Sequence, residues 1–334
     1  MTLAVRVGGR TLGLTNLDKV LYPRDGFTKG EVIDYYASIA PVMLPYLTDR
    51  ALTRLRYPGG VGSTPTGASR GGTTPPPTGA FYEKNAPVGT PGWVRRQRVG
   101  TSDGVIDYVV AEEVATLVWL ANLAALELHV PQWTISSGTI TSGTGGDDGV
   151  LDLPGDEAQP GDPLADRVVV DLDPGEVMTI VETARAALLV AARMVADGLV
   201  PVPQSSGSKG VQLYAAIAPA PSRQVWAYVR RLNATMARTR PEVFVASMSV
   251  QSRAGHIYVD YNQNLAARNT IAPYSLRGRE RPWVATPVTW EELGGVEQVG
   301  DLRFTAPEVL ARVEQHGDLA ADLLAADRPE LPGL

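Results

Sequence analysis

Residues 167–174 read RVVVDLDP, and this stretch decides how the rest of the sequence is interpreted. Its run of β-branched residues predicts a buried strand that ends in two carboxylates. Because residues i and i+2 of a strand face the same side, Asp171 and Asp173 should point together. Two such carboxylates repel one another unless a divalent cation lies between them, and Mg²⁺ or Mn²⁺ prefers oxygen ligands. Taken alone, Asp-x-Asp-Pro is also a common turn after a strand.

A second apolar stretch offers a further carboxylate. Residues 256–261, HIYVDY, predict a strand with Ile257 and Val259 on one face and Asp260 near its end. Two-metal phosphoryl transfer needs such a carboxylate from a neighbouring strand. Asp171, Asp173 and Asp260 are therefore the candidate catalytic and metal-binding residues, with two Mn²⁺ or Mg²⁺ ions as the expected cofactors.

The turn at residues 205–210, SSGSKG, consists mostly of small residues that leave backbone N–H groups free to face a phosphate. Lys209 supplies positive charge beside Ser206, Gly207 and Ser208. No Gly-x-x-x-x-Gly-Lys precedes it, which disfavours an NTPase motor. An ordinary turn is the alternative interpretation.

Two more side chains are candidates for a nucleotide site. His129, in LELHVPQW (126–133), is one of three histidines, and a hydrogen-bonded packing residue is the alternative. Arg277, in PYSLRGR (273–279), has the planar fork that clamps a triphosphate, although an arginine in a polar loop is usually solvated.

The remaining pattern predicts helices and strands in irregular order. Thr28 and Glu31 form a capping box at the start of an apolar helical spacing. We expect a strand over 51–57 and helices over 111–128, 176–197 and 223–240. Without repeats or regular βαβ spacing, the sequence predicts an α+β fold: one domain over 1–334 with two lobes and helices flanking a mixed or antiparallel β core.

Two segments interrupt this pattern. Residues 59–79 are Gly, Pro, Ser and Thr almost throughout, which predicts a flexible insertion without a core of its own. Residues 136–163 form a second loop rich in Gly, Asp and Pro. Residues 59–79 lead directly into Phe81 and Tyr82.

Composition narrows the class of protein. The 334 residues contain no cysteine, which excludes a disulfide scaffold and a cysteine nucleophile. No apolar run is long enough for a signal peptide or a membrane span, so we expect a cytoplasmic protein. The net charge of −6 conceals two basic blocks, with 13 Lys+Arg against 8 Asp+Glu in residues 1–110 and 11 against 3 in residues 201–283. Two basic blocks could bind a polyanion along one face of the protein. From charge alone, an ordinary solvated surface is an equally good interpretation.

The sequence resembles the polymerase domain of bacterial end-joining DNA ligase D, a member of the archaeo-eukaryotic primase superfamily. The resemblance covers about 300 residues, and its motifs occur in the family's order: LTNLDKVLYP (14–23), FYEKNAP (81–87), LELHVPQW, VVVDLDP, SSGSKG, SRAGHIYVDYNQN (252–264) and IAPYSLRGR (271–279). It implies a two-lobed primase-like fold. Because no ligase or nuclease module accompanies these motifs, we expect either a stand-alone member of the family or one domain of a longer protein.

Residue by residue, the resemblance implies four groups of contacts. Asp171, Asp173 and Asp260 would hold two metal ions, often manganese. The incoming nucleotide would contact His129, Ser206, Gly207, Ser208, Lys209, Gln263 and Arg277. The 5′-phosphate of a downstream strand would lie on Asn16, Lys19 and Lys29. DNA, chiefly the template, would contact Phe81, Tyr82 and Lys84, with Arg253 on a mobile loop nearby.

Three positions depart from the family pattern. Leu55 stands where relatives often have a lysine near the triphosphate, Gln212 where the SGSKG motif usually continues into histidine, and Val250 where a basic residue is common. Nucleotide affinity and the bridging of DNA ends are the properties that these changes put in question.

We therefore expect a template-dependent nucleotidyltransferase, a primase-polymerase that adds rNTPs or dNTPs to a primer in short-gap filling or end-joining repair. Expected partners are gapped or broken DNA with a 5′-phosphate, and Ku with a separate DNA ligase; a nucleoid-associated monomer is expected. A catalytically quiet DNA-end or gap-binding module is the rival from another class, and a metal-dependent phosphoesterase is the rival enzyme.

Overall fold

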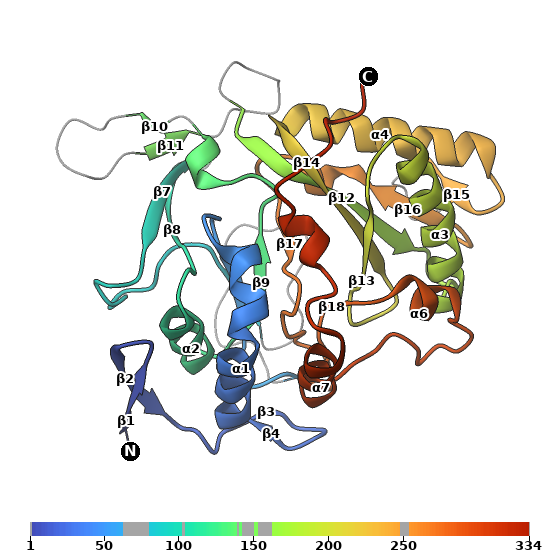
Figure 1. Ribbon diagram of the computed structural model, residues 1–334. Coiled ribbons are helices and arrows are strands. Elements are labelled where there is room, and N and C mark those ends of the chain that lie inside the picture. Colours follow the sequence, from blue (N-terminus) through green and yellow to red (C-terminus); the bar gives the residue numbers. More distant parts are fainter. Residues whose placement is uncertain are drawn as a thin grey trace.

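The computed structural model describes residues 2–62, 80–101, 104–138, 140–141, 150–152, 162–247 and 254–333. Its largest sheet has the order β15-β16-β12-β14-β13-β18 (Figure 1). These strands are β12 (Leu164–Pro174), β13 (Val202–Ser205), β14 (Val211–Pro221), β15 (Phe244–Val245), β16 (Ile257–Asp260) and β18 (Thr286–Pro287). Among the described pairs of this sheet, β15 and β16 are parallel and the others are antiparallel. The predicted α+β fold with a mixed or antiparallel β core is confirmed, and this sheet is mixed.

Alternation along β12 separates the two faces of this sheet. Val168, Val170 and Leu172 pack in one core with helices α3 (Ile180–Ala196) and α4 (Ser222–Thr239). Val169 belongs to the core of the other lobe. Because side chains alternate along a strand, Asp171 and Asp173 share the Val169 face. The two helices therefore cover one face and leave the carboxylates toward the other lobe.

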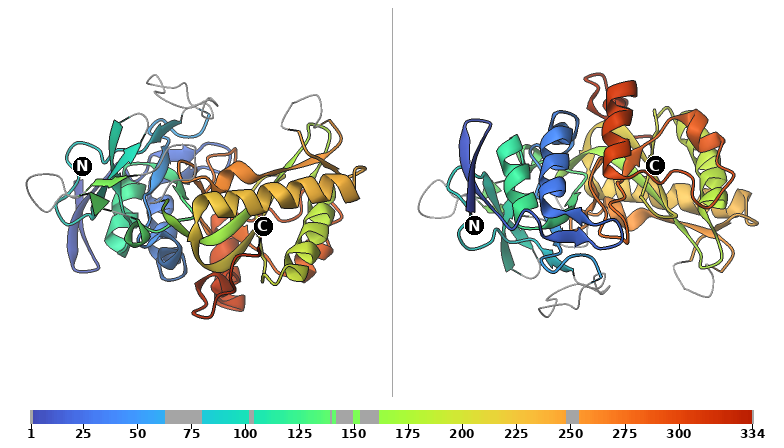
Figure 2. Two further views of the ribbon diagram at one scale, coloured as in Figure 1. Left: turned by 90° about the horizontal axis from the view of Figure 1, so that it is seen from above. Right: turned by 90° about the horizontal axis from the view of Figure 1, so that it is seen from below.

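The other lobe, here called the first lobe because most of it comes earlier in the chain, contains the sheet β17-β9-β5-β6. Figure 2 shows it beside the second lobe, which contains the largest sheet with α3 and α4. Its strands are β5 (Thr53–Arg56), β6 (Phe81–Glu83), β9 (Ala125–Val130) and β17 (Thr270–Ile271). Helices α1 (Lys29–Leu47) and α2 (Val114–Asn122) pack beside it, and the predicted capping box of Thr28 and Glu31 starts α1. Strand β17 follows β16, the strand that carries Asp260, in the chain. The chain therefore returns from the largest sheet to add a strand to this one.

A buried ion pair joins the lobes. Arg50, just after α1, donates to both carboxylate oxygens of Asp166 at 2.6 and 2.7 Å, and also to the Trp133 carbonyl at 3.0 Å. Arg50 is only 2% exposed. Asp166 lies on β12, so this contact fixes the carboxylate strand against the first lobe.

The remaining elements lie around these two sheets. They are the pairs β1 (Thr2–Val7) with β2 (Arg10–Thr15) and β3 (Val20–Tyr22) with β4 (Phe27–Thr28), the sheet of β7 (Arg96–Thr101), β8 (Gly104–Val109), β10 (Ile140–Thr141) and β11 (Val150–Asp152), helices α6 (Trp290–Gly294) and α7 (Ala306–His316), and 3₁₀ turns at Ile135–Ser137, Tyr261–Asn264 and Ala321–Leu324. None of the described helices is long and apolar enough to cross a membrane.

The predicted helix over 111–128 is wrong in its second half. Helix α2 ends at Asn122, Ala124 adopts a left-handed φ of 58°, and β9 begins at Ala125. A continuous apolar run carries no periodicity that separates helix from buried strand. The predicted loop over 136–163 contains the short strands β10 and β11, and most of the predicted insertion, residues 63–79, lies outside the described residues.

Candidate active site

The three candidate carboxylates belong to adjacent strands. Asp171 is the direct cross-strand partner of Asp260, and Asp173 lies two residues further along β12. Burial raises the pKa of Asp171 well above its usual range, and the negative charges of Asp173 and Asp260 raise it further. These three oxygen-bearing side chains therefore share one electrostatic environment, and a cation would relieve their repulsion.

The turn after β16 holds Asp260. Its carboxylate accepts the Asn262 backbone N–H and the Gln263 side-chain amide, each at 3.0 Å. In the described part of the chain, no three His, Cys, Asp or Glu side chains are gathered, as they stand, into a group that could hold a metal ion. The donor set still fits a hard divalent cation, because all three ligands are carboxylates; Asp260 would exchange its Gln263 contact to join it.

Gln212, one of the departures from the family pattern, contacts the first of these carboxylates. It is the partner of Asp171 in the β12–β14 ladder, and its side chain hydrogen-bonds to Asp171. The Gln212 Oε1 accepts from the Gln204 amide at 3.0 Å and from the Tyr214 hydroxyl at 3.2 Å, which leaves the amide N–H₂ for the carboxylate. A histidine here would titrate near neutral pH, whereas glutamine does not.

The SSGSKG turn lies against the same strand. The Ser206 N–H donates to the Gly210 carbonyl at 3.0 Å, and the Gly210 N–H returns to Ser206 Oγ at 3.2 Å. A Cβ added at Gly210 would lie 3.6 Å from the Leu172 carbonyl oxygen, between the two β12 aspartates in sequence. The Lys209 ammonium donates to the Gly175 carbonyl at 3.1 Å. The turn thus brings a cation to the end of the strand that carries Asp171 and Asp173.

Arg277 packs directly on this turn. Gly207 has a φ of 69°, and an added Cβ there would lie 2.9 Å from Arg277 Cγ and 3.0 Å from the Val284 carbonyl. The Arg277 carbonyl is held by the Tyr22 hydroxyl at 2.9 Å. The SSGSKG turn and Arg277 were predicted from separate stretches of sequence, and the fold packs Arg277 against Gly207 of this turn.

Glu127 is a candidate functional residue that the sequence motifs did not single out. Its carboxylate lies 3.0 Å from His129 Nε2 and 3.7 Å from Arg277 Nε, and it accepts the Gly278 N–H at 2.9 Å. Burial opposes its ionisation, but Arg277, His129 and the Gly278 N–H outweigh burial and lower the pKa of Glu127 to about 2. The available signal was a carboxylate inside the otherwise apolar strand AALELHV, where an unpaired charge is costly.

The aromatic pair lies on the neighbouring strand. Leu55 pairs with Tyr82 on one side and with Glu127 on the other, so these three side chains share a face of the sheet. Tyr82 is 44% exposed. Burial and the charge of Glu127 raise the pKa of Tyr82, while Arg277 opposes the shift. The Arg56 guanidinium lies 5.2 Å from the centre of the Phe81 ring.

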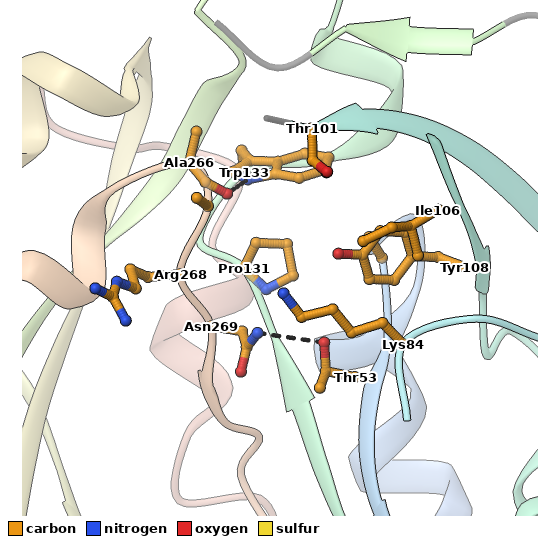
Figure 3. A pocket seen from close by; sticks show the side chains of 12 residues that line it. Thr53, Lys84, Thr101, Ile106, Tyr108, Pro131, Trp133, Ala266, Arg268 and Asn269 are labelled. Carbon is orange, nitrogen blue, oxygen red and sulfur yellow. Dashed lines mark hydrogen bonds between the residues drawn. The ribbon is translucent and has the colours of Figure 1, made fainter. Parts of the chain in front are cut away.

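Lys84 follows β6 and lines a separate pocket (Figure 3). Arg253 and Val250 lie outside the described residues, so their roles stay predictions. Ser208 belongs to the turn described above.

The predicted phosphate-binding residues gather at the start of α1. The Lys29 N–H donates to the Lys19 carbonyl at 2.7 Å, and the Lys19 N–H donates to the Asn16 carbonyl at 3.1 Å. Burial lowers the pKa of Lys29, and the charge of Lys19 lowers it further. The Lys29 ammonium donates to the Thr15 carbonyl, and the Lys19 ammonium donates to the Pro58 carbonyl. Two neighbouring cations on backbone carbonyls are an arrangement that an anion would stabilise.

Residues 28–320 match the family model described as LigD, primase-polymerase domain. The chain belongs to the LigD primase-polymerase family. The family and fold class predicted from the sequence are confirmed.

Similar proteins include LigD of Mycolicibacterium smegmatis, described as a multifunctional non-homologous end joining protein, at 40% identity over 95% of this chain and 36% of the relative. The bifunctional LigD of Bacillus subtilis is 28% identical over 92% of this chain and 43% of its own length. The chain thus spans less than half of these LigD relatives. The solved polymerase domain of Mycobacterium tuberculosis Ligase D in complex with DNA matches with a TM-score of 0.78 and 37% identity, over 95% of this chain and 99% of that one.

Proposed function

We propose that this LigD-family domain is a DNA-directed primase-polymerase that transfers nucleotides from rNTPs or dNTPs to a primer 3′-hydroxyl. The carrying observation is that the Gly207 turn and Arg277 pack together beside the cross-strand carboxylates Asp171 and Asp260. A triphosphate needs such cations close to the site of transfer, because its charge must be neutralised as pyrophosphate leaves.

The cofactors proposed are two Mn²⁺ or Mg²⁺ ions held by Asp171, Asp173 and Asp260. When bound, such ions supply charge stabilisation for the attacking and leaving oxygens. Lys209 and Arg277 bind and neutralise the triphosphate. Since Glu127 is ionised, it accepts the His129 Nε2–H and leaves Nδ1 as the nitrogen available to a ligand.

The proposed substrates are gapped or broken duplexes with a downstream 5′-phosphate, in the setting of end-joining repair. The LigD relatives are described as non-homologous end joining proteins, which supports this setting. Ku and a separate ligase are the partners proposed, and the domain acts as a monomer. Preference for ribonucleotides is a property that the family resemblance implies.

One assay separates this function from its rivals. Primer extension on gapped DNA is measured with MnCl₂ or MgCl₂ and with either nucleotide type. Templated extension that is lost in Asp173→Ala supports the proposal. Shortening of the primer would select the phosphoesterase, and tight DNA binding with neither reaction would select the quiet end-binding module.

A further inference from the structure

Helix α4 concentrates positive charge in an otherwise acidic protein. The helix and the residue after it, residues 222–240, contain five arginines and no aspartate or glutamate, although the net charge of the chain is −6. Two of the five are engaged locally: Arg231 donates to the Gly333 carbonyl at 2.6 Å, and Arg240 lies 3.8 Å from Glu242. The other three form the surface described next.

These three arginines lie along one side of α4, which we call the arginine face: Arg223, Arg230 and Arg238. They are seven and eight residues apart in the sequence, about two helical turns each, so they line up along the helix axis. The small residues Ala227 and Ala234 lie between them, so no large side chain obstructs an approaching ligand. The arginine face therefore presents a row of cations about 22 Å long.

The protein does not neutralise this row. Within the part of the chain that the structure describes, no carboxylate forms an ion pair with any of the three guanidinium groups. The Asp162 carboxylate accepts the Arg223 backbone N–H but does not pair with the guanidinium. Arg230 and Arg238 are exposed. An external anion would therefore meet cations that have no competing carboxylate.

Trp226 orients two of the three. The Arg223 guanidinium lies 4.6 Å from the centre of the Trp226 ring, and that of Arg230 lies 5.1 Å from it. The ring itself is held by an edge-on contact with Tyr261, whose centre is 5.7 Å away. Stacking on an indole fixes a planar guanidinium and leaves its N–H edge free to donate. Because this order exists before binding, a ligand loses less affinity to the immobilisation of these side chains.

The same tryptophan connects the arginine face to the candidate active site. Its indole N–H donates to Asn262 Oδ1 at 3.1 Å, and the Asn262 backbone N–H donates to the Asp260 carboxylate at 3.0 Å. The arginine face thus begins beside the turn that holds Asp260. Figure 1 shows α4 at the top of the molecule and the β3–β4 pair, which lies between the proposed 5′-phosphate residues Lys19 and Lys29, at the bottom.

The chemistry of this face fits a phosphate backbone. A row of guanidinium groups matches the repeated phosphates of a nucleic acid, each through a charge-assisted hydrogen bond. A protein partner or a membrane surface would also need apolar anchors. Among the described residues, the large apolar side chains that are exposed all lie on other elements. A single strand would need open rings for its bases, whereas the Trp226 ring already carries two guanidinium groups. Duplex DNA is therefore the partner that fits best.

We propose that the arginine face binds the sugar–phosphate backbone of the upstream duplex, the primer–template duplex behind the primer 3′-hydroxyl. The proposal rests on the proposed function, which places the primer end at Asp260 and the downstream 5′-phosphate at the opposite end of the molecule. A duplex that leaves the site away from the downstream strand then runs toward α4. The 18 residues of this helix are about 27 Å long, the length of about eight base pairs.

The test measures Kd for gapped DNAs whose upstream duplex, closed by a hairpin loop, is lengthened from about 6 to about 20 base pairs while the rest stays constant. In the wild-type protein, we expect affinity to rise about tenfold or more and then to stop rising, because α4 is short. Arg223→Gln combined with Arg230→Gln should remove most of the rise. The same double variant should reduce the slope of log Kd against log salt concentration by about 2, one for each lost phosphate contact.

Two further variants act as checks. Arg238→Gln leaves the Trp226 contacts intact and should still lower the salt slope by about 1. Arg185→Gln is the matched control, because Arg185 is an exposed arginine on α3 of the same lobe, and it should keep the full rise. Melting curves establish that each variant folds. A second series, in which only the downstream duplex is lengthened, should be the same in wild-type protein and in the arginine-face variants.

Three results would overturn the proposal. The first is a rise that survives in the double variant. The second is an equal loss of affinity in the upstream and downstream series, which would indicate a general effect of charge. The third is loss of poly-L-glutamate binding in the double variant with the DNA series unchanged, which would indicate an acidic protein partner. Extension assays separate the two proposals: wild-type protein that extends primers but shows no rise refutes the arginine face, whereas protein that neither binds nor extends any gapped DNA refutes the proposed function.

Discussion

His129 Nε2 lies 3.0 Å from one oxygen of Glu127, and the other oxygen of the same carboxylate accepts the Gly278 N–H at 2.9 Å. One buried carboxylate therefore links β9 to the loop that carries Arg277. Two residues proposed to bind the nucleotide depend on it for their orientation. Glu127 is a positioning residue in this arrangement, since its contacts are to protein groups.

Glu127→Gln should raise KM for the nucleotide about tenfold while kcat changes less, because the charge that orients Arg277 and His129 is removed but the side-chain shape remains. Steady-state extension kinetics at varied nucleotide concentration measure both constants. Glu292→Gln, which breaks the ion pair with Arg312 instead, is the control and should leave KM unchanged. Equal effects of the two variants on KM would contradict the positioning role.

The same residue predicts a dependence of stability on pH. The pKa of Glu127 falls from an ordinary 4.5 to about 2, so its ionised form stabilises the fold above pH 4.5 and that contribution is lost as the pH falls toward 2. The contribution is on the order of 3 kcal/mol. Urea unfolding of wild-type protein and Glu127→Gln from neutral pH down to about pH 2 should show the difference in free energy shrinking below pH 4.5. A difference that is constant with pH would refute this assignment.

Ionisation of Asp171 should change the folding stability with pH in the opposite direction. Its raised pKa means that its ionised form destabilises the metal-free protein, so stability falls as the pH rises through the folded-state pKa. Asp171→Asn should therefore raise Tm at neutral pH without metal, and the gain should vanish in acid, below the unfolded-state pKa. Primer extension should be lost in the same variant.

Asp301→Asn is the control. Asp301 accepts two backbone N–H groups and has a lowered pKa, so loss of its charge should not raise Tm.

Gly207→Ala should weaken nucleotide binding about tenfold or more, because its new Cβ would displace Arg277 and the Val284 carbonyl. Gly198→Ala carries the same positive-φ cost, with a φ of 88° and no atom within 4 Å of the added Cβ. Nucleotide titration and melting of both variants separate the two effects. A similar loss of nucleotide affinity in both would show that backbone strain alone is responsible.

Short gaps should bind more tightly with a 5′-phosphate at the downstream edge, because Lys19 and Lys29 bring two ammonium groups close together. Lys19→Met, at an exposed position, should reduce that preference about three- to tenfold at constant salt. Lys29 is buried, so its variant needs a melting control. A bound phosphate should raise the pKa of Lys29. If Lys19→Met weakened binding to phosphorylated and unphosphorylated gaps equally, the lysines would be general backbone contacts.

The candidate site was predictable where short-range rules apply. Alternation along a strand places Asp171 and Asp173 on one face, and the capping box of Thr28 begins α1 as expected. Pairing of Asp171 with Asp260 depends on hydrogen bonding between strands that are far apart in the sequence. Local spacing therefore made Asp260 only a candidate third carboxylate, and the family resemblance was needed to assign it. Glu127 was missed because its partner Arg277 is 150 residues away in the chain.

The chain has four lysines, and all of them lie at positions discussed above: Lys19, Lys29, Lys84 and Lys209. Arginine carries every other fixed side-chain cation and does not react with mild acylating reagents at neutral pH, because its pKa exceeds 12. Amine acylation followed by peptide mass spectrometry would therefore report on the proposed gap, template and triphosphate positions without any engineered label. A nucleotide should protect Lys209, and a phosphorylated gap should protect Lys19, each in the unmodified protein.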